Sequence, residues 1–433
     1  MFSPRDAVTS SSFKDRDMKP QQQRVSHCGA LMAMLGLAFF SSTALAAPYV
    51  PTSDLAPLEK LATRVNDSAR GAGSTAFSAS GSSSSSSRAM RTILARDPKN
   101  LDLALRVAQV YMARARSESD PRYLGQAQAA LATWWSQSEP PIPVLLLRAT
   151  IRQSNHDFKN SRLDLEQAVK REPSNAQAWL TLATVQQVTG DINAAADSCN
   201  KLLPLTARLV STVCVAAVDG ARGHAAKAFA AIDAVIAEAD ASRGANVGVR
   251  TWALTLQAEL AERLARPADA DRLYRASLAL DSGDAYTVAA YSDFLIDVGR
   301  ANDVLALIPA TTKVDTLLLR RAIAAKIVAS PDAAQVAEEL TQRFAASRAR
   351  GDRIHLREEA RFVLVVKNSP DEAVNLALDN WTVQKEPLDA RIVLEAAVAA
   401  RQSKASREVV LWVASTQLQG EKLGKLVTQA RAL

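Results

Sequence analysis

The sequence has few of the residues from which catalytic and metal sites are usually built. Its 433 residues include four histidines and three cysteines, and none stands at the spacing of HExxH or CxxC, the patterns that supply zinc ligands. The phosphate-binding motifs GxxxxGKS/T and GxGxxG and the nucleophile motif GxSxG are also missing. We therefore expect a protein that is not an enzyme and that binds no metal or cofactor.

Two features that could suggest chemistry have simpler interpretations. Ser198 and Lys201 match the SxxK pattern of penicillin-recognising enzymes, but the companion motifs SDN and KTG are absent. His156, His224 and His355 fall at predicted turns or helix starts, so we expect them to be solvated.

The charge and the aromatic content argue against nucleic-acid binding. Lysine and arginine number 52 against 45 aspartates and glutamates, which gives a net charge of +7. This excess is spread along the chain, whereas nucleic-acid binding needs a concentrated basic face with interleaved aromatic residues. Aromatic residues make up only 5% of the sequence. We expect no nucleic-acid partner.

The first 46 residues have the pattern of a signal peptide. Lys19 and Arg24 precede the apolar run 29–40, and Ala44 and Ala46 form an AxA cleavage pattern. We expect cleavage near Ala46. The apolar run is too short to cross a hydrocarbon core, so we expect no membrane span after cleavage.

The same region predicts where the protein works. Met18 begins a stretch of more usual length for a signal, which favours it over Met1 as the true start. Cys28 precedes the apolar run, whereas a lipid-anchored protein carries its acylated cysteine just after that run. The signal is bacterial in style. We expect an exported protein, periplasmic or secreted, without a lipid anchor.

Composition divides the rest of the chain into three parts. Residues 47–87 form an N-terminal segment whose run 71–87 is rich in serine and glycine and is expected to be a flexible loop. Residues 88–417 carry apolar positions at three- and four-residue steps, broken at intervals by proline, glycine, aspartate or asparagine. This pattern predicts short helices joined by tight turns. Residues 418–433 are expected to form a capping helix.

The turn signals recur along the chain. The stretches that end at Asn100, Asn175 and Asp284 each close one helix and open the next, and Gly190 and Gly299 mark turns inside helix pairs. One pair of this size has a face that it cannot bury alone. Pairs therefore stack side by side, and the stack forms a solenoid.

One unit carries small and large residues in a definite order. They are Ala168, Pro173, Trp179, Leu182, Ala183, Gly190 and Ala195. This order resembles the tetratricopeptide repeat, a unit of about 34 residues. Gln186 and Cys199 stand where that family usually has aromatic residues, and the resemblance is weak over 205–245 and 313–349. It implies an all-α fold, a right-handed α-solenoid of roughly eight to nine stacked antiparallel helix pairs.

The resemblance also implies which residues face a groove, because in this family the first helix of each pair lines the concave surface. Carried over position by position, they are Arg106, Gln109, Thr150, Gln153, Gln177, Thr184, Gln187, Glu259, Glu262, Asp293 and Asp297. Amides and hydroxyls suit hydrogen bonding to an extended peptide. The cationic clamp of the chaperone-binding members is not visible here. The alternative is a solvated face without a partner.

The tryptophans divide into two groups. Five of them occur about one per predicted pair and are expected in the core: Trp134, Trp179, Trp252, Trp381 and Trp412. Trp135, beside Trp134, must face another direction. It is the best candidate for an exposed aromatic contact.

Two cysteines remain beyond residue 46. Cys199 and Cys214 lie at similar distances from a predicted turn at 204–206, so an antiparallel helix pair would bring them face to face. An oxidising compartment would permit a disulfide between them. The alternative is two small buried hydrophobic residues.

The leading hypothesis is a non-catalytic exported scaffold that holds a protein or peptide partner within an envelope-assembly or export complex. The alternative is an accessory solenoid of polysaccharide export or cell-wall machinery, which would meet a glycan. Helical superhelices also form the body of some lytic transglycosylases, but the repeats leave no separate catalytic domain here.

Overall fold

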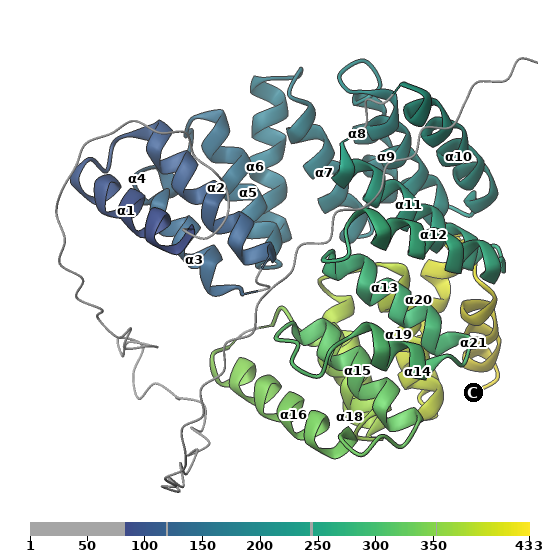
Figure 1. The fold of residues 1–433 in the computed structure, drawn as a ribbon. Coiled ribbons are helices and arrows are strands. Elements are labelled where there is room, and N and C mark those ends of the chain that lie inside the picture. The colour runs from purple at the N-terminus through teal and green to yellow at the C-terminus, as the bar shows by residue number, and fades with distance from the viewer. Residues whose placement is uncertain (1–82, 118–119, 243–245, 352) are drawn as a thin grey trace, which may run out of the picture. The chain divides into compact units, whose positions relative to one another are not determined.

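The computed structural model describes residues 83–117, 120–242, 246–351 and 353–433 (Figure 1). The predicted signal peptide, its cleavage site near Ala46 and most of the N-terminal segment lie outside the described residues. Within the described ranges every regular element is a helix. None of these helices is both long enough and apolar enough to cross a membrane.

The helices are mostly short and follow one another closely along the chain. They are α1 (Ser83–Arg96), α2 (Leu101–Ser117), α3 (Arg122–Ala130), α4 (Ala132–Trp135), α5 (Ile142–Ser154), α6 (Phe158–Arg171), α7 (Ala176–Val188), α8 (Ile192–Lys201), α9 (Arg208–Ala221), α10 (Ala225–Ser242), α11 (Val247–Arg263), α12 (Pro267–Leu280), α13 (Ala285–Asp297), α14 (Ala301–Leu307), α15 (Asp315–Ile327), α16 (Ala333–Ala349), α17 (Leu356–Val365), α18 (Pro370–Trp381), α19 (Pro387–Ala399), α20 (Ser403–Thr416) and α21 (Glu421–Arg431). The predicted pattern of short helices and tight turns is confirmed.

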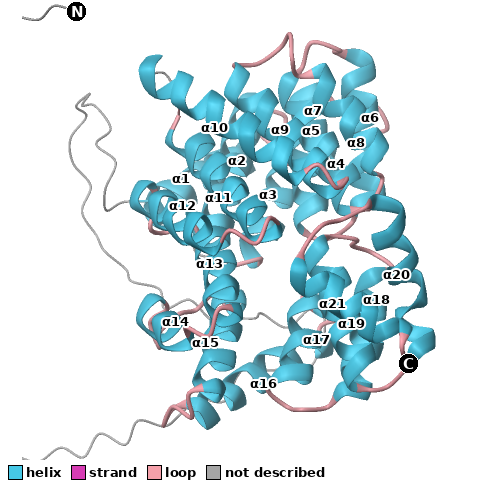
Figure 2. Ribbon diagram, turned by 90° about the vertical axis from the view of Figure 1, so that its right-hand side faces the viewer, coloured by secondary structure: helices cyan, strands magenta, loops and turns pink. Residues whose placement is uncertain are grey.

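Consecutive helices pack in antiparallel pairs, and the pairs stack on one another. The pairs are α2–α3, α5–α6, α7–α8, α9–α10, α11–α12, α13–α14, α15–α16, α17–α18 and α19–α20, with α21 packed on α19. The first helix of each pair also contacts the first helix of the next pair. Figure 2 shows this arrangement of helices joined by short loops. The predicted all-α solenoid of tetratricopeptide-like helix pairs is confirmed.

The pair α7–α8 shows why the sequence folds locally in this way. The Asn175 side chain accepts a hydrogen bond from the backbone N–H of Ala178 at 3.0 Å and so caps α7. Gly190 has a φ of +83°, a left-handed conformation that glycine adopts at little cost, and it turns the chain between the two helices. Ala183 and Ala195 are buried in one apolar cluster, because small residues let two helices approach closely.

The residues that depart from the repeat pattern are engaged in packing at the same pair. Gln186 is buried, and its side-chain carbonyl accepts a hydrogen bond from the Ser198 hydroxyl at 2.7 Å. Cys199 of α8 forms a disulfide with Cys214 of α9, and their Cα atoms lie 5.5 Å apart. Ser198 is therefore a buried packing residue, which agrees with the absence of the companion motifs SDN and KTG.

Helix α1 begins inside the run 71–87, for which composition predicts a flexible loop. Residues 83–87 are helical, so the predicted loop ends earlier than its serine content suggests. The reason lies in the next residues: Leu94 is buried in a cluster that includes Ala104 of α2, and Met90 packs against the same cluster. This apolar contact stabilises α1, and the helix extends back into the serine run.

Candidate partner-binding surface

The predicted groove residues all lie on the first helices of pairs. They are Arg106 and Gln109 on α2, Thr150 and Gln153 on α5, Gln177, Thr184 and Gln187 on α7, Glu259 and Glu262 on α11, and Asp293 and Asp297 on α13. Because the first helices of neighbouring pairs contact one another, these residues follow one row of helices. The row divides into two parts with different surroundings.

The part on α2, α5 and α7, here called the N-terminal polar surface, is accessible to solvent. Arg106, Gln109, Gln177 and Thr184 are exposed, and Thr150, Gln153 and Gln187 are half-buried. Within the described ranges, the side chains of Arg106, Gln109, Gln153 and Gln187 have no hydrogen-bond or ion-pair partner. Gln177 donates to Thr181 Oγ1 at 3.0 Å, and Thr184 donates to the carbonyl of Leu180 at 3.0 Å. Most of the amides on this surface are therefore free to bind another molecule.

The carboxylates of α11 are held by tyrosines. Tyr286 donates a hydrogen bond to Glu259 at 2.6 Å, and Tyr274 donates to Glu262 at 2.5 Å. Burial raises the pKa of Glu259, and it raises the pKa of Glu262 to about 8 although the bond from Tyr274 opposes this shift. Glu262 is therefore mostly protonated at neutral pH and adds little negative charge to the row.

Asp293 of α13 lies between two buried arginines. Its Oδ2 is 2.8 Å from Nη2 of Arg320 on α15, and its Oδ1 is 2.5 Å from Nη1 of Arg361 on α17. Burial by itself would raise the pKa of Asp293, but the two guanidinium groups outweigh it and lower the pKa to about 2. Asp293 is an internal ion-pair residue at every physiological pH.

Asp297, one turn further along α13, is paired with the C-terminal helices. Arg391 of α19 donates to it at 2.7 Å, and Lys422 of α21 donates at 2.8 Å. Glu395 of α19 contacts the same two cations, at 2.8 Å and 3.2 Å. Burial would raise the pKa of Asp297, but Arg391 and Lys422 lower it overall. The two aspartates of the row are thus paired with the chain's own cations.

The loop between α18 and α19 contacts the end of α7. The backbone N–H of Lys385 donates to the carbonyl of Val188 at 2.8 Å, and Val383 packs against the apolar cluster of α5, α6 and α7. A Cβ placed on Gly190 would lie 3.1 Å from Cβ of Lys385, so glycine is needed here for close approach as well as for its φ. The C-terminal pairs therefore engage the acids of α13 and the end of α7, and they leave the N-terminal polar surface accessible.

The sequence predictions missed the cations that hold Asp293 and Asp297. Arg320 stands in the apolar stretch 317–325, where a solvated charge is not expected. Arg361 is similarly placed beside buried Phe362. A charged residue inside an apolar helix face indicates a buried ion pair, but it does not indicate which distant carboxylate is the partner.

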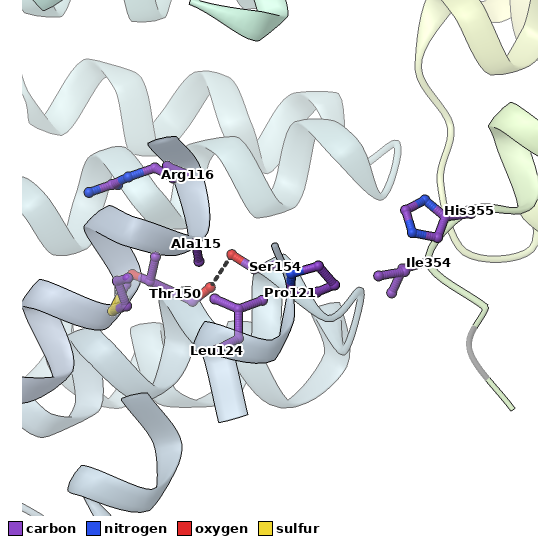
Figure 3. Close-up of a pocket in the computed structure, with 9 residues that line it drawn as sticks. Ala115, Arg116, Pro121, Leu124, Thr150, Ser154, Ile354 and His355 are labelled. Carbon is purple, nitrogen blue, oxygen red and sulfur yellow. Dashed lines mark hydrogen bonds between the residues drawn. The ribbon is translucent and has the colours of Figure 1, made fainter. Parts of the chain in front are cut away.

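A pocket of about 230 Å³ lies at the end of α2, beside Thr150. It is lined by Met112, Ala115, Arg116, Pro121, Leu124, Thr150, Ser154, Ile354 and His355. Figure 3 shows Ile354 and His355, from the loop before α17, on one side and the residues of α2, α3 and α5 on the other. The Thr150 hydroxyl donates to the carbonyl of Leu146 at 2.8 Å, and the Ser154 hydroxyl donates to the carbonyl of Thr150 at 3.0 Å. The pocket wall is therefore mainly apolar, and the hydroxyl groups of Thr150 and Ser154 in it already donate hydrogen bonds within α5.

The tryptophans largely follow their predicted roles. Trp134 and Trp381 are buried, and Trp179, Trp252 and Trp412 are half-buried and pack against core clusters. Trp135 is half-buried, with the Arg152 guanidinium 5.6 Å from its ring centroid. The ring of Trp135 is thus less open to a partner than its sequence position suggests.

Two histidines, His156 and His355, differ from the prediction of solvated turns. His355 is half-buried and lines the pocket. The His224 side chain is 54% exposed, as predicted. His156 is half-buried, has a φ of +58° and stacks on Phe158 with ring centroids 5.3 Å apart. Burial lowers the pKa of His156 to about 4, so its imidazole is neutral and packs as an aromatic group. No group of three potential metal ligands occurs in the part of the chain that the structure describes.

The comparisons with known proteins bear only on the fold. Neither a protein-family profile nor a curated protein matches the chain. Similar solved structures include a tetratricopeptide repeat protein from Parabacteroides merdae, with 11% identity over 67% of this chain and 98% of that chain and a TM-score of 0.36. The Cut9–Hcn1 hetero-tetramer of APC/C matches with 12% identity over 80% and 58% and a TM-score of 0.40. Yeast Tom70 matches with 11% identity over 81% and 96% and a TM-score of 0.33. At such values the likeness says nothing about partners.

Proposed function

We propose that the protein is a non-catalytic scaffold that binds a protein or peptide partner on the N-terminal polar surface. The observation that carries this proposal is that the side chains of Arg106, Gln109 and Gln187 have no hydrogen-bond or ion-pair partner among the described residues. Free amides and a free guanidinium suit hydrogen bonding to the backbone and side chains of an extended peptide. Asp293 and Asp297, by contrast, are held in ion pairs and are not offered to a partner.

We also propose that this binding takes place after export, within an envelope-assembly or export complex. The signal-like pattern of residues 1–46 supports the exported location. The buried disulfide between Cys199 and Cys214 agrees with it, because disulfides persist in oxidising compartments and are rare in the cytosol.

Site-specific photo-crosslinking in cells tests the proposal. A crosslinking side chain is placed at Gln109 or at Gln187, and adducts are identified by mass spectrometry. The matched control is Leu163, an exposed residue on α6, the second helix of its pair. We expect one dominant protein adduct from the first two positions and none from Leu163. Recovery of a glycan in place of a protein would favour the polysaccharide alternative.

A set of variants tests the same surface without a crosslinker. Gln153, Thr184 and Gln187 are replaced together by glutamate, which adds bulk and charge to the surface. We expect loss of partner capture with an unchanged thermal unfolding midpoint, because none of the three side chains is buried in the core. Capture that persists unchanged would show that the partner binds elsewhere.

A further inference from the structure

The helices that carry the N-terminal polar surface, α2, α5 and α7, together contain more basic than acidic residues. Helices α5 and α7 contain no acidic residue, and α2 contains only Asp102. The arginines of α5, Arg148 and Arg152, are both paired with Asp164 of α6, at 2.7 Å and 2.6 Å. The single carboxylate of Asp164 thus holds both guanidinium groups, although it balances only one of their two charges. Within the described ranges, the arginines of these three helices without such a partner are on α2.

Two of the arginines on α2 have no acidic or hydrogen-bonding partner for their guanidinium groups in the described part of the chain. Arg106 and Arg116 are exposed, and their guanidinium groups make no hydrogen bond or ion pair with any described residue. Arg114 differs from them, because it donates to the Tyr123 hydroxyl at 2.6 Å. Asp102 lies one turn before Arg106 and forms no ion pair with it. Arg106 belongs to the N-terminal polar surface, and Arg116 extends it, because Arg116 follows the neutral amide Gln109 by seven residues, about two turns of α2.

The spacing of these two arginines suits an extended segment. Ten residues of helix separate Arg106 from Arg116, which corresponds to about 15 Å along α2. An extended peptide covers that distance in roughly four to five residues. Two carboxylates at that separation would each meet one guanidinium, and such charge-assisted bonds are the stronger class of hydrogen bond.

The apolar pocket lies at the Arg116 end of this line. Met112, Leu124 and Ile354 form much of its wall, and Arg116 lines it as well (Figure 3). A volume of about 230 Å³ accepts one large aliphatic or aromatic side chain. The hydroxyls of Thr150 and Ser154 are bonded to their own helix and present no free donor. The polar side chains left in the lining are Arg116 and His355, and most of the wall is apolar, so the pocket favours an apolar peptide side chain over a glycan.

We infer that the partner presents an internal acidic segment with two carboxylates about four residues apart, followed by a bulky apolar side chain that enters this pocket. The inference rests on the proposed function and adds the chemistry of the partner to it. The opposite charge of the partner also guides its approach, because exposed charges of opposite sign accelerate association.

The test uses the exported chain and synthetic twelve-residue peptides with blocked ends, followed by fluorescence anisotropy. The probe peptide carries two glutamates four residues apart and then a phenylalanine; one control peptide has glutamine at both acidic positions, and another has serine for phenylalanine. We expect the probe to bind about tenfold or more tightly than either control. Equal binding of all three peptides would overturn the inference.

Protein variants separate the two parts of the site. Arg106→Glu with Arg116→Glu should weaken binding of the probe by about tenfold or more, whereas Arg272→Glu with Arg407→Glu, the same change of charge on α12 and α20, should not. Ala115→Trp fills the pocket and should remove the preference for phenylalanine alone. Unfolding midpoints of all variants are measured beside binding, so that a folding defect is recognised.

The outcomes also distinguish this inference from the proposed function. If crosslinking from Gln109 captures a protein that the Arg106→Glu and Arg116→Glu variants capture equally well, the result would support the proposed scaffold function and would refute the inferred acidic segment of the partner. If an acidic polysaccharide binds with the same arginine dependence and without any effect of Ala115→Trp, both proposals are wrong.

Discussion

Asp297 of α13 and Arg391 of α19 are joined by two hydrogen bonds, of 2.5 Å and 2.7 Å, although 94 residues separate them in the sequence. Their side chains are only 20% and 17% exposed. Lys422 of α21 binds the same carboxylate. These contacts join a middle pair of the solenoid to its last helices, so the fold depends on contacts beyond those of neighbouring pairs. Several consequences can be measured.

Removal of Asp293 should destabilise the protein strongly. The Asp293→Ala change leaves Arg320 and Arg361 buried without their shared counter-ion, and breaking a buried ion pair from one side costs about 3 kcal/mol or more. The free energy of unfolding, measured with urea, should fall by that amount. Asp269→Ala removes an exposed pair with Arg272 and should cost less than about 1 kcal/mol. Equal effects of the two changes would mean that the buried ion pairs do not stabilise the fold.

The disulfide should make its own contribution to the free energy of unfolding. Cys199 and Cys214 are 15 residues apart, and a closed loop of that length lowers the entropy of the unfolded chain by an equivalent of about 3 kcal/mol. The double change of both cysteines to alanine should lower the free energy of unfolding by about that amount. Dithiothreitol should destabilise the natural protein and leave the double variant unaffected. If dithiothreitol does not change the unfolding midpoint of the natural protein, the disulfide does not form.

The sequence predicts much of this architecture because the turn signals are local. Asn175 and Gly190 lie within a few residues of the helix ends that they determine, and their cap and φ are those expected. Even 208–242 and 315–349, which lie where the repeat resemblance is weak, fold as the pairs α9–α10 and α15–α16. The apolar spacing of the helices is sufficient there, since pairing needs a buried face more than it needs particular residues.

The candidate site was less predictable because its accessibility depends on distant residues. Position on a first helix places Gln187 and Asp297 in one row, and the structure shows that row. Whether each side chain is free or paired depends on Arg391 and Lys422, far along the chain, and no local pattern connects them. Only a folded chain shows that the amides are free and the acids are engaged.

Replacement of His156 should change the response to acid. Burial lowers the pKa of His156 from 6.5 to about 4, so the unfolded chain binds a proton more readily than the folded chain between these values. Stability is therefore lost as the pH falls from about 6.5 to about 4. His156→Asn, which keeps a residue that tolerates the φ of +58°, should reduce this loss. Identical profiles for the natural protein and His156→Asn would refute the assignment.

Glu262 should produce the opposite dependence at higher pH. Burial raises its pKa from 4.5 to about 8, so the folded chain binds a proton more readily than the unfolded chain between these values. The contribution of Glu262 is complete below about pH 4.5 and is lost as the pH rises toward 8, with a slope of up to about 1.4 kcal/mol per pH unit. Glu262→Gln keeps a neutral group beside Tyr274 and removes the titration.

The variant should therefore be more stable than the natural protein at pH 8 and similar to it at pH 5, as measured by urea unfolding at the two values. A variant that is less stable than the natural protein at both pH values would mean that the carboxyl of Glu262 is ionised in the fold and stabilises it through its charge.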